Sequence, residues 1–152
     1  MKFLAAALLA ILFILAPAGC RQKSDSSLPV TPMQIGAENF NLEIATSFHD
    51  QEVGLMHRDH LDPDHGMIFV SKGEQPQTFW NHDVHFPLDL IFLDAGGAIV
   101  SLKHMAAFSE ANTASDAPAK YVIELNAGTT SRLQLKIGDR LAIPKPALNP
   151  PS

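Results

Sequence analysis

Apolar and polar residues alternate with a period of two in several short segments of this chain. Residues 41–45 read Asn-Leu-Glu-Ile-Ala, and residues 120–126 read Lys-Tyr-Val-Ile-Glu-Leu-Asn. Such alternation is typical of a strand that packs one face on a core. Short apolar runs at 66–70, 78–80 and 140–143 predict three further strands.

The clearest predicted pairing is a β-hairpin. Two apolar, β-rich runs at residues 88–94 and 98–102 flank Ala95-Gly96-Gly97. Because a glycine pair can adopt positive φ, it favours a tight turn between antiparallel strands. A polar, alanine-rich stretch at 105–119 follows, and its length is typical of a functional or mobile loop.

Two short helices are expected, one at about residues 50–58 and one at 129–135. Thr129 is the candidate N-cap of the second helix, and Gly138 is suited to a left-handed C-cap or a tight turn. The pattern as a whole predicts a mainly β (α+β) domain, a small curled sheet or barrel-like domain with two short helices. The Gly138-Asp139 turn resembles that of small cradle-loop barrels and favours a barrel over an open sheet.

The N-terminus has the pattern of a signal peptide over residues 1–19. One positive charge, Lys2, precedes an apolar run at residues 3–16, and the small residues Ala18 and Gly19 follow. This run is too short to cross a hydrocarbon core as a helix.

Cys20 is the only cysteine, so an intramolecular disulfide is excluded. The segment resembles the lipobox of bacterial lipoproteins, which implies acylation of Cys20, for example by palmitate, although Pro17 stands where leucine is usual. Cleavage by an ordinary signal peptidase near Ala18 and an uncleaved anchor are the alternatives. Arg21 stands where a retention signal carries aspartate, which favours the periplasmic face of the outer membrane.

The segments on either side of the predicted domain are polar or proline-rich. Residues 20–33 are expected to form the lipidated cysteine and a flexible tether, since a Ser- and Pro-rich segment buries little area. Residues 144–152 form a proline-rich tail in which no regular element is expected. The domain is therefore predicted to span residues 34–143.

The charge balance disfavours polyanionic partners. The chain carries 11 basic and 16 acidic residues, a formal net charge of -5, and no basic stripe. Nucleic acid and anionic headgroups are therefore not expected as partners, and the predicted contact with a membrane is through the lipid anchor.

Seven histidines, six of them between His49 and His85, make a metal site one hypothesis. His57 and His60 would share a face if the first helix extends that far, and His82 and His85 have the same spacing. The competing interpretation is a set of histidines in solvated loops, and no H-E-x-x-H motif is present.

Two carboxylates stand in otherwise apolar strands, Asp89 and Glu124. A buried carboxyl group has a raised pKa and can act as an acid. The alternative is that each side chain points to solvent or pairs with Arg58 or Arg132. Nucleophilic catalysis finds no support, because a G-x-S-x-G elbow is missing.

The stretch around Trp80 is rich in aromatic residues, with Phe79 beside it and Phe86 close by. Such a group lines an apolar pocket or forms the middle of the core.

Seven short motifs follow one another along the predicted domain: Gly54-Leu55-Met56 with Arg58, Gly66–Val70, Phe79-Trp80, Pro87–Asp94, Gly97–Val100, Tyr121–Glu124 and Gly138-Asp139. Read in this order, they resemble the domain of unknown function 192 family. The resemblance covers nearly the whole predicted domain and implies a compact, mainly β fold without an established reaction. Asn81-His82-Asp83-Val84 stands where the family commonly has Met, a basic residue, Asn and Thr.

The leading hypothesis is a membrane-tethered, non-enzymatic binding module of the cell envelope, with no cofactor or ligand assigned. Its site would use Arg58, Trp80, Asp89 and Glu124, which match family positions and combine charge with an aromatic face. The first alternative is a metal-binding or metal-dependent protein. The second is an envelope hydrolase or transferase that acts through Asp89 or Glu124. In the first of these alternatives, the metal ligands would be His57, His60, His82 and His85.

Overall fold

The computed structural model describes residues 28–149. The predicted signal peptide, Cys20 and the first part of the predicted tether lie outside these residues, as does the end of the tail. Among the described residues no helix is both long and apolar enough to cross a bilayer.

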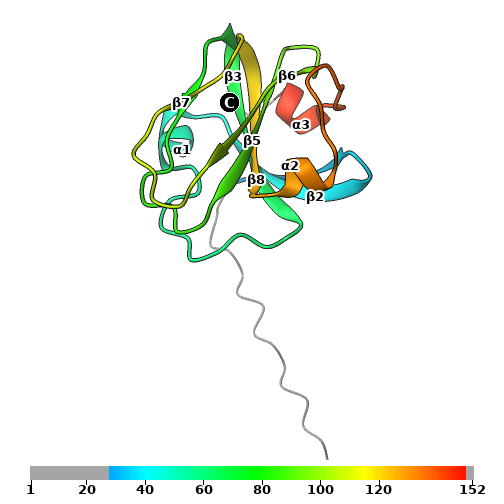
Figure 1. Cartoon of the computed structure of the whole chain (residues 1–152). Coiled ribbons are helices and arrows are strands. Elements are labelled where there is room, and N and C mark those ends of the chain that lie inside the picture. The colour runs from blue at the N-terminus through cyan, green and yellow to red at the C-terminus, as the bar shows by residue number, and fades with distance from the viewer. Residues whose placement is uncertain (1–27, 150–152) are drawn as a thin grey trace, which may run out of the picture.

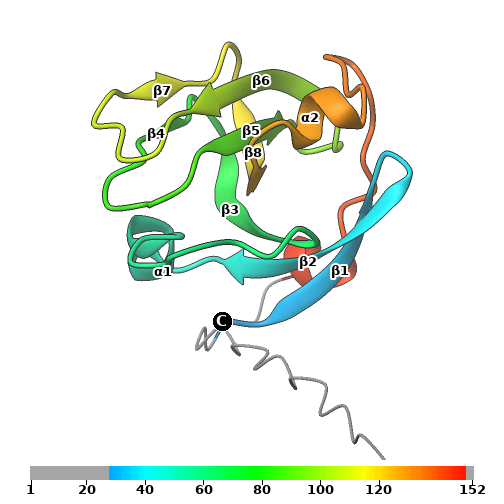
Figure 2. The same ribbon diagram turned by 60° about the horizontal axis from the view of Figure 1, so that its bottom comes forward.

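A six-stranded mixed sheet forms the centre of the molecule, in the order β1-β2-β3-β8-β5-β6. Neighbouring strands are antiparallel except for β2 and β3, which run parallel. The sheet curls strongly, so that β1 and β2 face β5 and β6 across its concave side (Figure 2). Its strands are β1 (Val30–Ile35), β2 (Glu38–Ala45), β3 (His65–Gln75), β5 (Leu88–Leu93), β6 (Ile99–Met105) and β8 (Ala119–Asn126).

Smaller elements lie on both sides of the curled sheet. A second, two-stranded sheet pairs β4 (Thr78–Phe79) with β7 (Thr113–Ala114). The helices are α1 (Phe48–Val53), α2 (Thr129–Arg132) and α3 (Lys145–Leu148). In Figures 1 and 2, α1 and the small sheet lie on one side, and α2 and α3 lie on the other.

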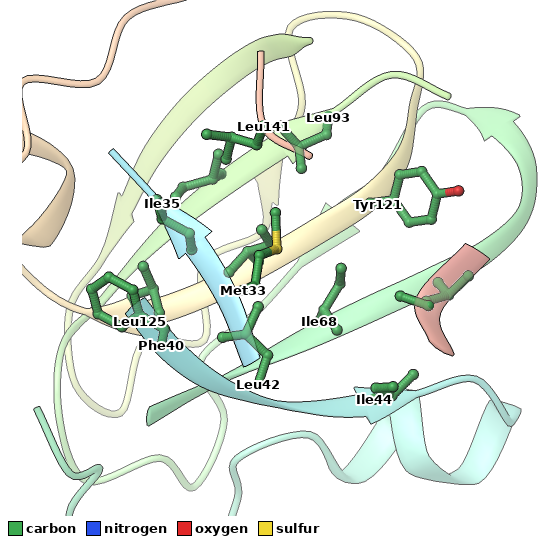
Figure 3. Packing of buried hydrophobic residues seen from close by; sticks show 14 of the residues in the cluster. Met33, Ile35, Phe40, Leu42, Ile44, Ile68, Leu93, Tyr121, Leu125 and Leu141 are labelled. Carbon is green, nitrogen blue, oxygen red and sulfur yellow. The ribbon is translucent and has the colours of Figure 1, made fainter. Parts of the chain in front are cut away.

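Alternating side chains of the central strands divide the core into two clusters. The concave cluster is enclosed by the curl, and Leu141 packs on it from the segment after α2 (Figure 3). Ala147 in α3 also belongs to this cluster. The second cluster packs beneath α1 and β4 and includes Met67, Phe69 and Leu90. Because both faces of the sheet are covered, side chains that point to either face of the central strands are buried. Each fully buried large apolar side chain contributes about 1.5–3 kcal/mol to the free energy of unfolding. We call the two sides the concave face and the α1 face.

The predicted fold class is confirmed, since the domain is mainly β with short helices. The hairpin is also confirmed, because β5 pairs with β6 around Gly97, whose φ is 78°. The preference for a barrel is wrong: β1 and β6 remain the two ends of an open sheet. The predicted strand at 140–143 makes only an isolated bridge from Arg140 to Ala98, and so it cannot close the sheet.

Several predicted boundaries are wrong. Helix α1 begins two residues earlier than expected, capped by Ser47, and ends at Val53, where Gly54 takes a φ of 49°. Thr129 lies inside α2, whose N-cap is Gly128. The end of the predicted tether, residues 30–33, belongs to β1 (Val30–Ile35), because alternate residues of this strand pack on the concave cluster.

The predicted tail also contains a regular element, α3, in place of an irregular segment. Proline is tolerated there because the first turn of a helix needs no backbone donor from it.

Candidate functional site

Two buried carboxylates stand in one row on the α1 face of the sheet. Glu43 on β2 is opposite Met67 on β3, and Met67 is opposite Glu124 on β8. Residues opposite each other on neighbouring strands point to the same side, so both carboxyl groups flank the Met67 side chain. Glu43 is 2% exposed and Glu124 is 4% exposed.

Arg58 reaches this row from the loop that follows α1. Its Nη1 donates to Glu43 Oε1 at 2.6 Å and its Nη2 donates to Glu43 Oε2 at 2.9 Å. The fork of a guanidinium matches a carboxylate in this bidentate geometry, which is the strongest form of the ion pair. The charge of Glu43 is thereby neutralised in the interior.

Burial is the largest influence on the pKa of Glu124. Removal from water disfavours its charged form and raises the pKa of its carboxyl group to about 8, while the nearby Arg58 guanidinium opposes the shift. A carboxyl group of this kind is protonated at neutral pH and is poised to lose its proton when its surroundings change.

A small pocket opens beside Glu124, between α1 and the chain around Trp80. It holds about 30 Å³, enough for one or two water-sized groups. Helix α1 is fixed over the sheet because Gln51 Nε2 donates to the carbonyls of Ala45 at 3.2 Å and Val70 at 2.9 Å. The lining residues are Gln51, Glu52, Val53, Gly54, Leu55, Met56, Phe69, Phe79, Trp80, Asn81, Val84 and Glu124.

Asn81 lines the pocket and has one unpaired acceptor. Its Nδ2 donates to the carbonyls of Phe86 at 3.1 Å and Ala106 at 2.7 Å, which fixes the orientation of the amide. Its Oδ1 is buried and has no hydrogen-bond partner, although the residue is 0% exposed. Buried polar atoms are normally satisfied, so the unpaired Oδ1 marks a place beside the pocket where a donor is missing.

Trp80 forms the exposed edge of the pocket. It is 46% exposed, and its ring stacks on His82 with centroids 5.0 Å apart. An aromatic face held by a stacked neighbour presents a flat surface at little cost in side-chain entropy. Trp80 and Glu124 therefore meet at one pocket, and Arg58 lies next to it through its interaction with Glu124.

Asp89 does not belong to this site. It lies in β5 with Ile91 and Leu93, which pack in the concave cluster, whereas Leu90, which is opposite Glu124, packs beneath α1. The carboxyl groups of Asp89 and Glu124 therefore lie on opposite faces of the sheet. A catalytic pair made of these two residues is excluded.

The surroundings of Asp89 give it a structural task. Its Oδ2 accepts from Thr130 N at 2.9 Å and from Thr130 Oγ1 at 2.7 Å, which satisfies the first turn of α2. Its Oδ1 is 3.3 Å from His104 Nδ1.

The predicted four-histidine metal site does not form. His57 pairs with Asp83 and His60 with Asp62, while His82 pairs with Glu110. His85 lies 3.5 Å from Asp59 and 3.6 Å from Asp83. Because α1 ends at Val53, His57 and His60 share no helical face, and within residues 28–149 no group of three or more His, Cys, Asp or Glu side chains has the arrangement of a metal site.

Comparison with known proteins places the domain in a family. The family model DUF192, described as "Uncharacterized ACR", matches residues 31–143. This chain belongs to the DUF192 family. Among curated proteins, no sequence matched it.

Two solved structures resemble this DUF192 chain. One is a protein from Sinorhizobium meliloti named as a candidate transcription regulator, with 33% identity and a TM-score of 0.72, covering 78% of this chain and 97% of the other. The second, from Novosphingobium aromaticivorans, is a protein of unknown function with 28% identity and a TM-score of 0.75, covering 80% of this chain and 90% of the other.

Sequence reasoning missed two residues of the DUF192 site, Glu43 and Asn81. Glu43 follows the alternating pattern of β2, which predicts a solvent-facing side chain when only one face of a sheet is buried. Asn81 stands at a position where the chain departs from the family pattern. That departure was the available signal, but it did not predict which atom of Asn81 would lack a partner.

Proposed function

We propose that this DUF192 protein is a non-enzymatic binding module, tethered to the cell envelope, whose pocket beside Trp80 takes a small polar group of its ligand. The observation that carries the proposal is the buried, unpartnered Oδ1 of Asn81 at a pocket that Glu124 also lines. Leaving a buried acceptor unpaired costs about 1–3 kcal/mol. A ligand that donates a hydrogen bond there recovers this free energy.

The composition of the pocket supports binding over catalysis. The lining holds two carboxylates, Glu52 and Glu124, but none of its residues is a serine, threonine, cysteine, histidine or lysine. Covalent catalysis by a hydroxyl, thiol or amine needs such a nucleophile beside a base, and this lining supplies no nucleophile of that kind. Its apolar walls with a few convergent polar atoms are typical of a recognition site.

The envelope location is proposed from the N-terminal sequence. The signal-like segment at 1–19 and Cys20 resemble a lipoprotein leader. Labelled palmitate added to growing cells should be incorporated into the protein and should be lost in Cys20→Ala. Equal labelling of both forms, or recovery of the unprocessed chain from the cytosol, would refute the tether.

The name given to the S. meliloti protein raises a second class, regulation of transcription. The charge of the present chain disfavours it, because a net charge of -5 without a basic stripe repels phosphate backbones. We therefore keep the binding module as the proposed function.

The binding test uses the full chain in detergent and compares two exposed aromatic residues. Methylammonium, methanol, acetamide and acetate are titrated while amide chemical shifts are followed by NMR. At least one probe should shift residues of the pocket and should bind more weakly to Trp80→Ala. No shift with any of the four probes would refute the binding module.

Phe108→Ala is the matched control for Trp80→Ala. Phe108 is 59% exposed and stacks on His85 as Trp80 stacks on His82, but it does not line the pocket. Phe108→Ala should therefore bind the probes as the unmodified protein does. Equal weakening in both variants would show that the pocket is not the site.

A further inference from the structure

Within residues 28–149, the row on the α1 face brings one cation, Arg58, to the two carboxylates Glu43 and Glu124. Both guanidinium nitrogens that face the row are used by Glu43, at 2.6 Å and 2.9 Å. Arg58 therefore neutralises Glu43 and acts on Glu124 only at longer range, without a hydrogen bond between them. When Glu124 is ionised, the side chains of Glu43, Arg58 and Glu124 together carry a net charge of -1.

We propose that the polar group taken by this pocket is a primary ammonium group, which supplies the missing positive charge beside Glu124. This inference rests on the proposed function, because it names the chemistry of the ligand for the same pocket. Either a proton or the cation of the ligand can neutralise the carboxyl group of Glu124. The ligand therefore displaces the proton when it binds.

The hydrogen-bonding groups of the pocket favour a ligand that donates. The side-chain amides of Gln51 and Asn81 spend their donors on backbone carbonyls, and Asn81 Oδ1 is left as an acceptor. An ionised Glu124 adds a second acceptor. An ammonium group carries three donors and no acceptor, so it satisfies both without leaving an unpaired lone pair of its own.

Trp80 and the size of the pocket also favour a primary ammonium group as the ligand. The face of an indole ring attracts a cation by about 0.5–1 kcal/mol at an exposed site. A space of about 30 Å³ admits the tip of an aminomethyl group but not a bulky quaternary ammonium. Magnesium keeps several of its waters when it binds, and this space is too small for a hydrated ion. Calcium takes six to eight oxygen ligands, more than the polar side chains of the lining supply.

The exchange of a proton for a cation makes binding depend on pH. Burial holds the pKa of Glu124 at about 8, so below that pH the ligand has to displace a proton. An alkylammonium group, like that of lysine with a pKa of about 10.4, stays charged over this range. Its affinity should rise about tenfold per pH unit up to about pH 8 and then level off.

The experiment uses the fluorescence of Trp80, the only tryptophan of the chain. The full chain in detergent is titrated with methylammonium chloride between pH 6 and pH 9, at constant ionic strength. Potassium chloride, methanol and acetamide are titrated in parallel. Methylammonium should bind, and its affinity at pH 8 should exceed that at pH 6 by about fiftyfold, because Glu124 is about half ionised at pH 8 and about 1% ionised at pH 6.

Two variants localise the effect. Glu124→Gln removes the charge and keeps the shape, so it should lose the pH dependence and most of the affinity for methylammonium. Glu74→Gln, an exposed carboxylate that does not line the pocket, should bind as the unmodified protein does. If Glu124→Gln fails to fold, the pH series on the unmodified chain decides alone.

The possible outcomes separate this inference from the proposed function. If methanol or acetamide binds and methylammonium does not, the binding module stands and the ammonium proposal fails. Potassium binding as tightly as methylammonium would also overturn it, as would an affinity that does not vary between pH 6 and pH 8. If none of the probes binds at any pH, both proposals fail.

Discussion

Asp89 and Glu124 are equally buried carboxylates, each 4% exposed, on opposite faces of the same sheet. On the concave face, Asp89 accepts from both the amide and the hydroxyl of Thr130. On the α1 face, Glu124 has only the nearby Arg58, which already forms a bidentate pair with Glu43. A buried carboxylate that accepts hydrogen bonds from the protein has a structural role. A buried carboxylate without such donors is available to a donor from a ligand.

Arg58→Ala should have the largest effect on stability. The substitution leaves Glu43 buried without its partner, and breaking a buried ion pair from one side costs about 3–5 kcal/mol. Urea denaturation measures the loss. Arg132→Ala is the matched control, since Arg132 pairs with Glu38 on the surface and an exposed pair contributes at most about 1 kcal/mol. Equal losses would remove the distinction between the two ion pairs.

Glu124→Gln tests the unsatisfied carboxyl group through pH. Because the folded pKa of about 8 lies above the unfolded value, the folded state binds the extra proton. Stability from this group is therefore full in acid and is lost as pH rises from about 4.5 to about 8. At about 1.4 kcal/mol per pKa unit, the loss amounts to a few kcal/mol.

The Gln variant should lack this component of the pH dependence. Urea unfolding of both proteins at pH 5, 7 and 9 measures it. Curves that remain parallel over this range would show that Glu124 does not carry the proton assigned to it.

Asp89→Ala should destabilise the protein by about 1–2 kcal/mol, because Thr130 N loses the acceptor at the first turn of α2. Hydrogen exchange of the α2 amides should accelerate, while methylammonium binding in the α1-face pocket should remain unchanged. A change in binding would mean that the two faces are coupled.

His104→Ala should have the smallest effect, within about 0.5 kcal/mol. The side chain is 59% exposed and its contact with Asp89 is long, at 3.3 Å. A thermal melt is sufficient to measure it. A loss as large as that of Asp89→Ala would show that the histidine, rather than Thr130, holds the aspartate.

The positions of the strands were predictable from the sequence, but which of their faces are buried was not. A period of two at residues 41–45 locates β2 correctly and also predicts that Glu43 faces water, because the pattern assumes one buried face. Here α1 and its following loop cover that side, so the same alternation describes two buried faces. The family motif supplied Arg58, Trp80 and Glu124, but it could not separate Asp89 from them.

Contacts between segments that are far apart in the sequence determine the surroundings of the histidines and of Asn81, which the local sequence pattern does not predict. The four histidines are close in sequence, yet each lies beside a carboxylate of the surrounding loops, and only His57 and His85 share one, Asp83. The orphaned Asn81 oxygen depends on carbonyls of Phe86 and Ala106, which no local pattern relates to it.

The strand order also has a consequence for the time at which the chain can fold. β8 is the last strand in the sequence, yet it lies between β3 and β5 and joins the two halves of the sheet. Until residue 126 has left the ribosome, β3 and β5 have no common partner, and long-range pairings of this kind form slowly. The central sheet is therefore expected to assemble only after β8 has emerged, so that the first five strands wait for a partner that is made after them.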